Sequence, residues 1–122
     1  MKFVIEGRLD GLNDYIRACR TNFYVGNDMK KKNQKTVKKA IKRAKLHNVT
    51  KYPIKLKITW YEPNSKRDID NITFASKFIL DELVKSEIIC DDSQKYVSEI
   101  QHSVQVDKDK PRIEVEITEK EE

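Results

Sequence analysis

The sequence predicts an α+β domain in which helices pack on a small mixed or antiparallel sheet of about four strands. Four segments alternate apolar and polar residues with a period of two, which is typical of half-buried strands. Three other segments place apolar residues three and four positions apart, which is typical of amphipathic helices. The 122 residues suit a single domain over residues 1–122.

The first two elements lie before residue 21. A strand is expected at residues 2–9, because Phe3 and Ile5 alternate with polar residues. A short helix is expected at residues 12–20, with Asn13 as a candidate cap.

A loop and a long basic helix are expected next. Residues 22–28 form the expected loop, which contains the aromatic residues Phe23 and Tyr24. Aromatic rings can stack on unpaired bases, but packing in a core is more common, and we expect these two in the core. The helix is expected from Asp28, its N-cap, to about residue 47. Its narrow apolar stripe consists of Val37, Ala40, Ile41 and Ala44.

The second half contains three strands and one helix. A strand is expected at residues 54–60, where apolar residues alternate with lysines. An apolar helix is expected at residues 71–87, with Asp70 as a plausible N-cap. Two strands at residues 97–106 and 113–117, joined by a turn, are expected to form a hairpin.

Charge is distributed unevenly along the chain. The net charge is +5, but residues 1–61 contain 16 Lys or Arg and 4 Asp or Glu, whereas residues 62–122 contain 9 and 16. The halves therefore carry +12 and −7. A strongly basic half beside an acidic half indicates a surface for a polyanion next to a site for cations. The alternative is that the lysine-rich helix is merely a solvated face.

Several classes of protein are excluded. Cys19 and Cys90 are widely separated and form no CxxC motif, which argues against a zinc or redox site and favours free or buried thiols in a reducing compartment. The N-terminal segment is too short and too charged for a signal peptide, and no apolar run approaches the roughly 18 residues of a membrane span. We expect a cytoplasmic protein with no membrane partner.

Two pairs of aspartates suggest metal chemistry. Asp68 and Asp70 lie two residues apart, so in an extended segment their side chains would point the same way. Asp91 and Asp92 follow the apolar helix. Mg²⁺ and Mn²⁺ bind oxygen ligands, usually one or two carboxylates with water and substrate phosphate. The turn after the helix could bring the second pair back to the first, which spacing alone does not decide.

Each of these acids also has an ordinary alternative role. Asp70 could serve only as an N-cap, and the second pair could form a turn before a strand. Lys77, on the helix between the pairs, could be the ion-pair partner of Asp81 four residues later.

Basic residues that could hold phosphates occur in three places: on the short helix at Arg17 and Arg20, on the long helix at Lys38 and Lys42, and before the first acidic pair at Lys66 and Arg67. Lysine binds phosphate as a point charge, so such contacts give affinity and salt dependence without reading bases. The alternatives are ordinary solvent exposure for the helical residues and an ion pair with a nearby acid for the arginine of the last pair.

The order of these motifs resembles one known family. The string Asp68-Ile69-Asp70-Asn71, an apolar helix with a lysine, and Asp91-Asp92 about a helix length later are similar to the RusA family of Holliday junction resolvases, which are crossover junction endodeoxyribonucleases. The resemblance covers the C-terminal half and, more loosely, Asn13-Asp14-Tyr15 with the basic helix. It implies a homodimeric Mg²⁺-dependent endonuclease, with Mn²⁺ as a substitute, that nicks four-way DNA symmetrically in recombination and repair, encoded by a bacterium or phage.

The resemblance also assigns residues by position. The family's lysine, three residues after the asparagine, is replaced here by Phe74, and the nearest lysine is Lys77, whose side chain is expected to lean toward the N-terminus of its helix. The implied catalytic residues are Asp68, Asp70, Asp92 and Lys77. The implied metal ligands are Asp68, Asp70, Asp91 and Asp92. The expected DNA-binding residues are Asn13, Arg17, Arg20, Lys38, Lys42, Lys66 and Arg67.

Three other functions remain open at this stage. The basic half could belong to a non-catalytic nucleic-acid-binding module with structural aspartates. The chain could also be a less selective nuclease for branched DNA, because no residue pattern encodes four-way geometry. A protein-interaction module, with the acidic half facing a basic partner, is the third alternative.

Overall fold

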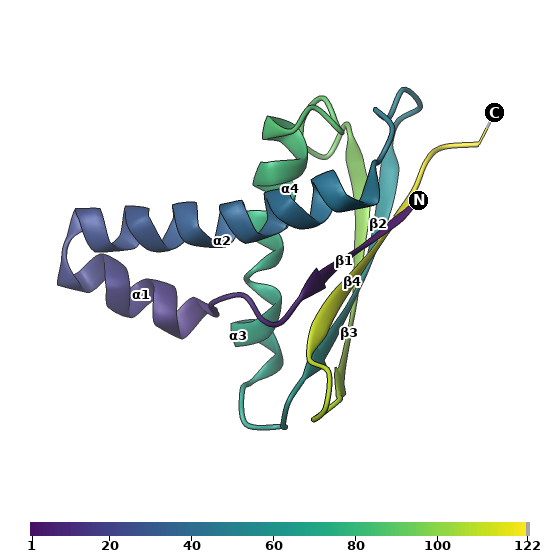
Figure 1. Cartoon of the computed structure of the whole chain (residues 1–122). Coiled ribbons are helices and arrows are strands. Elements are labelled where there is room, and N and C mark those ends of the chain that lie inside the picture. The colour runs from purple at the N-terminus through teal and green to yellow at the C-terminus, as the bar shows by residue number, and fades with distance from the viewer. Residues whose placement is uncertain (122) are drawn as a thin grey trace.

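A computed structural model describes residues 1–121 of the chain, which form a four-stranded sheet with helices on one of its faces (Figure 1). The predicted α+β class is confirmed. The strands are β1 (Lys2–Glu6), β2 (Ile54–Glu62), β3 (Val97–Val106) and β4 (Arg112–Thr118). The helices are α1 (Leu12–Thr21), α2 (Phe23–Ala44), α3 (Ile69–Thr73) and α4 (Ser76–Lys85).

The strand order is β1-β4-β2-β3, with β4 antiparallel to both of its neighbours and β3 parallel to β2. The predicted hairpin of the last two strands is therefore wrong, because β2 lies between them. The turn after β3 carries the chain past the end of β2, where the Asp107 backbone N–H donates to the Glu62 carbonyl at 2.7 Å. Turn chemistry predicts a reversal of direction but does not say how far across the sheet the chain moves.

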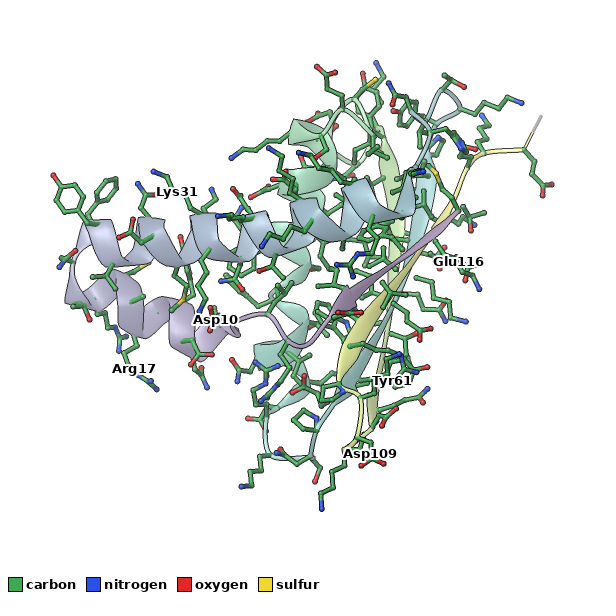
Figure 2. The ribbon with its side chains drawn as sticks, viewed as in Figure 1. Asp10, Arg17, Lys31, Tyr61, Asp109 and Glu116 are labelled. Atoms are coloured by element: carbon green, nitrogen blue, oxygen red, sulfur yellow. The ribbon has the colours of Figure 1, made fainter. Side chains whose placement is uncertain are left out.

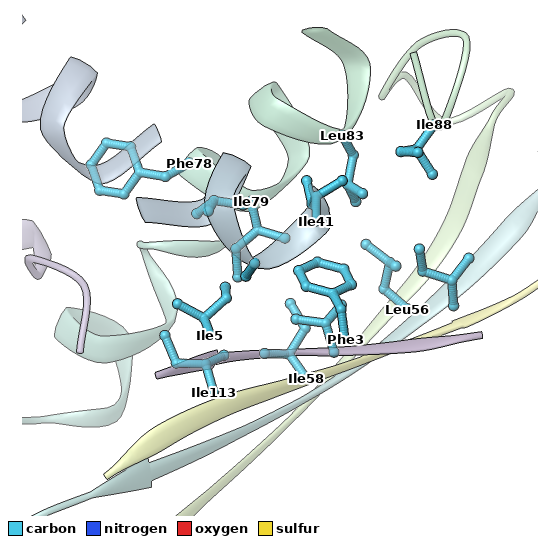
Figure 3. Packing of buried hydrophobic residues seen from close by; sticks show 14 of the residues in the cluster. Phe3, Ile5, Ile41, Leu56, Ile58, Phe78, Ile79, Leu83, Ile88 and Ile113 are labelled. Carbon is cyan, nitrogen blue, oxygen red and sulfur yellow. The ribbon is translucent and has the colours of Figure 1, made fainter. Parts of the chain in front are cut away.

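The core lies between the sheet and the helices (Figure 3). Apolar side chains that alternate along β1, β2 and β4 point toward α2, α4 and the turn after α4. Burying one such side chain stabilises the fold by about 1.5–3 kcal/mol relative to exposure. Core residues seen in the close view are Phe3, Ile5, Ile41, Leu56, Ile58, Phe78, Ile79, Leu83, Ile88 and Ile113.

Helices α1 and α2, residues 12–44, form an antiparallel hairpin, called here the helical arm, whose tip lies away from the sheet (Figure 1). The predicted loop at residues 22–28 is wrong, because α2 begins at Phe23. Asn22 is the N-cap, and its side chain accepts a hydrogen bond from the Val25 N–H at 3.0 Å. The predicted start at Asp28 lies inside α2, five residues after its real start, and the predicted end near residue 47 lies beyond the last helical residue, Ala44.

Gly26 is a packing residue of the arm and not a turn residue. A Cβ atom at Gly26 would lie 2.7 Å from the Cys19 Sγ, so glycine permits the close approach of α2 to α1. The helix start moves the two aromatic residues to the tip of the arm. Phe23 and Tyr24 are each 75% exposed, so their predicted place in the core is also wrong.

The predicted helix at residues 71–87 is divided into α3 and α4. Between them, hydrogen bonds join residues three apart, from the Ala75 N–H to the Ile72 carbonyl and from the Phe78 N–H to the Ala75 carbonyl. This tighter turn breaks the regular helix. The ring of Phe74 at the break lies 5.4 Å from that of Tyr15 on α1, so the break packs against the helical arm.

None of the helices within residues 1–121 combines the length and apolar character needed to cross a bilayer.

Candidate metal and DNA-binding sites

Asp68 and Asp70 lie at the start of α3. Asp68 is the N-cap in an extended conformation, but its side chain accepts no capping hydrogen bond. Asp70 lies inside the first turn, so it is not the predicted N-cap, and the predicted extended arrangement of the pair is also wrong. The Asp70 Oδ1 accepts a hydrogen bond from the Asn71 backbone N–H at 2.9 Å. Both carboxylates are exposed to solvent.

Asn71 connects this pair to the base of the helical arm. Its side chain is largely buried, and its Oδ1 accepts a hydrogen bond from the Asn13 backbone N–H at 2.9 Å. Gly11 is the N-cap of α1, so the predicted cap at Asn13 is wrong. A Cβ atom at Gly11 would lie 2.5 Å from the Asn71 Oδ1, so glycine is required for this contact.

Asp91 and Asp92 lie in the segment between α4 and β3, and both are exposed. Hydrogen bonds from the Asp92 backbone N–H and then from Ser93 hold the pKa of Asp91 below its usual range. This is the turn described above as their ordinary alternative. The preceding residue, Cys90, donates its backbone N–H to the Tyr52 hydroxyl oxygen at 2.9 Å.

The two acidic pairs lie near opposite ends of β2 (Figure 1). Arg67, just before the first pair, contacts Glu62 at the end of the strand at 2.8 Å, whereas Tyr52, just before the strand begins, contacts the segment of the second pair. A strand rises about 3.3 Å per residue, so β2 separates the pairs by roughly 25 Å. Within residues 1–121 no three His, Cys, Asp or Glu side chains are grouped so that they could hold a metal ion. A single chain therefore does not bring the four aspartates together.

Asp68 and Asp70 alone suit a magnesium ion bound together with substrate. Mg²⁺ commonly takes one or two carboxylates and fills its remaining positions with water and phosphate oxygens. Asp70 uses only one carboxylate oxygen for a hydrogen bond inside the described chain, and the Asp68 carboxylate caps no backbone group. The donor set of this pair therefore fits the metal that the acidic motif suggests.

Lys77 lies on α4 and does not contact either carboxylate of the first pair. Its Nζ lies 3.9 Å from the Asp81 Oδ2, which is the ordinary alternative described above, and Lys30 of α2 lies 3.8 Å from the same oxygen. At the position of the family's lysine, Phe74 packs against Tyr15 and Phe78. Lys77 is exposed, and its contact is a weak surface ion pair.

Glu62 is a buried carboxylate that the sequence analysis missed. It is 4% exposed, and its oxygens lie 2.8 Å from Arg67 and 2.9 Å from Arg8. Burial alone would raise the pKa of Glu62, but hydrogen bonds from Arg67 and Arg8 lower it below its ordinary value of 4.5. Arg67 is therefore engaged with an acid and not free to hold a phosphate. The alternation of β2 continues inward to this position, and that signal could have indicated a buried Glu62.

Another missed residue is Asn33 of α2, which is buried. Its Nδ2 donates to the Asp10 Oδ2 and to the Met29 carbonyl, both at 2.8 Å, and its Oδ1 accepts from the Asp10 N–H at 2.9 Å. It joins the arm to the segment after β1. Asn33 lies four residues before Val37 on the apolar stripe, and this position was its signal in the sequence.

Three of the predicted DNA-binding residues gather on α1. Asn13, Arg17 and Arg20 line a shallow hollow of about 520 Å³ together with Ile16 and Thr21. Neither arginine forms an ion pair with any residue in the range 1–121. Both guanidinium groups are therefore available for an anion.

A second basic surface follows α2 and its C-cap. Lys38 and Lys42 line a groove of about 840 Å³ between α2 and α4. The groove is bordered by seven lysines in all, and six of them recur along one side of α2 at spacings that keep them near one another. The six are Lys31, Lys35, Lys38, Lys39, Lys42 and Lys45, and the seventh is Lys85 of α4. The six lysines of α2 and its C-cap have no acidic partner within the described chain. Lys66, in the loop before α3, is also exposed.

Basic surfaces on α1 and α2, in a chain that also exposes carboxylates, indicate a protein that acts on nucleic acid. The family model described as endodeoxyribonuclease RusA matches residues 11–118 of the chain. The chain belongs to this family, whose members are endodeoxyribonucleases that act on Holliday junctions. The resemblance found in the sequence is thereby confirmed, as is the nuclease class. Comparison with curated proteins gives no match.

Proposed function

We propose that the chain is a Mg²⁺-dependent, structure-selective endonuclease, with Mn²⁺ as a substitute, that resolves Holliday junctions by paired symmetric nicks in DNA recombination and repair. The observation that carries this proposal is the exposed pair Asp68 and Asp70 in a chain of the RusA family, connected through Asn71 to a basic helical arm. The pair suits the ion, and the arm suits the phosphate backbone.

The residues of the chain have separate tasks in this proposal. Asp68 and Asp70 would hold the ion beside the scissile phosphate. When bound, Mg²⁺ supplies a Lewis acid and lowers the pKa of its water. Lys77 stabilises negative charge that develops on the phosphate, since its exposed contact with Asp81 is weak enough to exchange. Asn13, Arg17, Arg20, Lys38, Lys42 and Lys66 hold flanking phosphates, whereas Arg67 supports the fold through Glu62.

The separation of the acidic pairs favours a dimer. A centre that uses all four aspartates needs more than one chain, because about 25 Å divides the pairs within a chain. We propose a homodimer in which Asp68 and Asp70 of one protomer meet Asp91 and Asp92 of the other. Two such centres related by a two-fold axis could act on two strands of a four-way junction.

Cleavage of a labelled four-way junction, compared with linear duplex of the same sequence, tests the activity. We expect paired nicks in the junction alone for the wild type in Mg²⁺, and their loss in Asp70→Asn while binding persists. Asp109→Asn, in the exposed turn between β3 and β4, is the matched control and should cleave normally. Equal cutting of both DNAs would indicate a less selective nuclease, and binding without cutting would indicate a non-catalytic module.

Mixing two inactive variants tests the composite centre. In a heterodimer of Asp70→Asn and Asp92→Asn, one composite centre carries both substitutions and the other carries neither. We therefore expect the mixture to recover single-strand nicking that neither variant shows alone. If each centre lay within one chain, every centre would carry one substitution, and the mixture would remain inactive.

A further inference from the structure

We propose that Phe23 and Tyr24, at the tip of the helical arm, stack on bases that lose their partners at the branch point of the DNA substrate. This inference rests on the proposed function and identifies which part of the DNA the arm contacts. The two residues are adjacent, and each is 75% exposed. Large apolar rings are normally buried, so two neighbouring exposed rings indicate a surface that is covered by a partner.

The rings lie on a rigid support. Only Asn22 separates α1 from α2, and its side chain caps α2 through the Val25 N–H. The contact between Gly26 and Cys19 holds the two helices together next to the tip. The rings themselves meet edge to face, with centroids 5.8 Å apart and an interplanar angle of 76°. A partner would therefore meet rings whose positions are already restricted, which lowers the entropic cost of binding.

The tip ends far from the sheet, at the outer end of the arm (Figure 1). It therefore projects beyond the acidic residues at the start of α3 and can reach DNA that the rest of the chain does not cover. Arg17 and Lys31 extend from opposite sides of the arm behind the tip (Figure 2). Cations thus flank the aromatic pair on both sides.

The charge of the arm selects the kind of partner. Residues 12–44 contain ten Lys or Arg and two Asp, a net charge of +8. A second copy docked arm against arm would bring two such charges together, which electrostatic repulsion opposes. Nucleic acid instead offers phosphates to the cations and flat apolar bases to the rings, which is the combination that single-strand binding surfaces use. Continuous duplex keeps its bases paired and stacked, whereas bases at a branch point become accessible when the junction opens and they lose their partners.

The test measures binding of the full chain to a four-way junction and to linear duplex without divalent ions, so that no cleavage occurs. For Phe23→Ala/Tyr24→Ala we expect junction affinity to fall on the order of tenfold or more, since each stacked base contributes substantially to binding. Duplex affinity should change less than about twofold, because the phosphate contacts remain. The exchanged variant Phe23→Tyr/Tyr24→Phe keeps both rings and should bind both DNAs as the wild type does.

A second readout follows the bases directly. With 2-aminopurine at the branch point, wild-type protein should change the fluorescence, and the double alanine variant should not. Unchanged junction affinity and fluorescence in that variant would overturn the proposal. The proposal would also be overturned if the double alanine variant lost self-association in sedimentation but kept the wild-type ratio of junction to duplex affinity. In that case the tip would contact a second copy of the chain.

The two proposals can fail separately. If the wild type binds and cuts junctions and the double alanine variant does so equally well, only the role of the tip is rejected. If the wild type binds no DNA, both the proposed function and the role of the tip are rejected. Thermal unfolding checks that the variants fold, which is expected because both side chains are exposed.

Discussion

The helical arm and the remainder of the chain differ in both charge and burial. The arm, residues 12–44, has a net charge of +8, whereas the other residues contain 15 Lys or Arg and 18 Asp or Glu, a net charge of −3. The sheet and the helices beside it bury most of the large apolar side chains, whereas the outer arm exposes Phe23 and Tyr24. Fold stability should therefore depend on the sheet region and the buried residues that α2 adds to its core, and DNA contact on the exposed side chains of the arm, so substitutions in these two sets should have separable effects.

Two phenylalanines give the largest expected contrast. Phe78 is 1% exposed in the core, so Phe78→Ala removes buried apolar surface and leaves a cavity, and it should lower the free energy of unfolding by about 3–5 kcal/mol. Phe23→Ala at the exposed tip should change it by less than about 0.5 kcal/mol. Urea unfolding followed by circular dichroism measures both. Similar losses for the two variants would contradict the division between the regions.

The lysines of α2 should give the next largest effect, on binding and not on stability. Replacing Lys35, Lys38 and Lys42 by glutamine removes three charges from the groove side of α2, where phosphate contacts are proposed. The affinity for DNA should fall on the order of 100-fold at 0.15 M salt, and the slope of log affinity against log salt should decrease by about 0.9 for each lysine. Anisotropy titrations at several salt concentrations measure both quantities.

The matched control for that triple variant removes the same charge from the rest of the chain. Glutamine at Lys108, Lys110 and Lys120, which are exposed and lie outside the arm, should leave the salt slope unchanged. An equal decrease in both triple variants would show that net charge alone governs binding, and that the arm has no special part in it.

Glu62→Gln should have a smaller effect, on stability and on its pH dependence. Hydrogen bonds to charged groups contribute about 2 kcal/mol, so we expect a loss of roughly that size at neutral pH. Because the pKa of Glu62 is lowered in the folded state, its ion pairs stabilise the fold above pH 4.5 and lose their effect as the pH falls below that value. Denaturant unfolding between pH 3 and pH 7 should show the two proteins converging in acid. A constant difference across that range would contradict the lowered pKa.

Lys77→Gln should have the smallest effect on stability. Its ion pair with Asp81 is exposed and joins residues four apart on a helix, and such a pair contributes about 0.3–0.5 kcal/mol. Junction cleavage should fall much more than stability if Lys77 acts on the phosphate, as proposed. A single-turnover cleavage rate measured beside a urea titration separates the two effects. An unchanged rate would remove Lys77 from the proposed centre.

The local elements of the sheet could be predicted because their patterns are local. The alternation from Ile54 to Trp60 identifies a half-buried strand without reference to the rest of the chain. The place of that strand between β3 and β4 is set by pairing between distant segments, which no local pattern records. The start of α2 was missed because Gly26 resembles a turn residue, whereas its real role depends on Cys19 of the neighbouring helix.

The candidate site was predictable in composition but not in arrangement. The motif that contains Asp68 and Asp70 is readable in the sequence, and so is the later pair. Whether the pairs meet depends on the path of the chain around β2, and the structure places them near opposite ends of that strand. The partner of Arg67 was missed for a related reason, because the expected strand ended at residue 60, whereas β2 continues to a buried Glu62.

The contact between Asn71 and the base of α1 also fixes a distance on the DNA. Asn71 follows Asp70 directly, and its side chain holds the Asn13 N–H, with no room for even a methyl group at Gly11. This contact therefore fixes the position of the acidic pair relative to the base of the arm. If the arm binds the branch point and the acidic pair lies at the cleaved phosphate, this contact sets the number of nucleotides between the branch point and the nick. A substitution that weakens the contact should therefore make the position of the nick less uniform before it lowers the rate of cleavage.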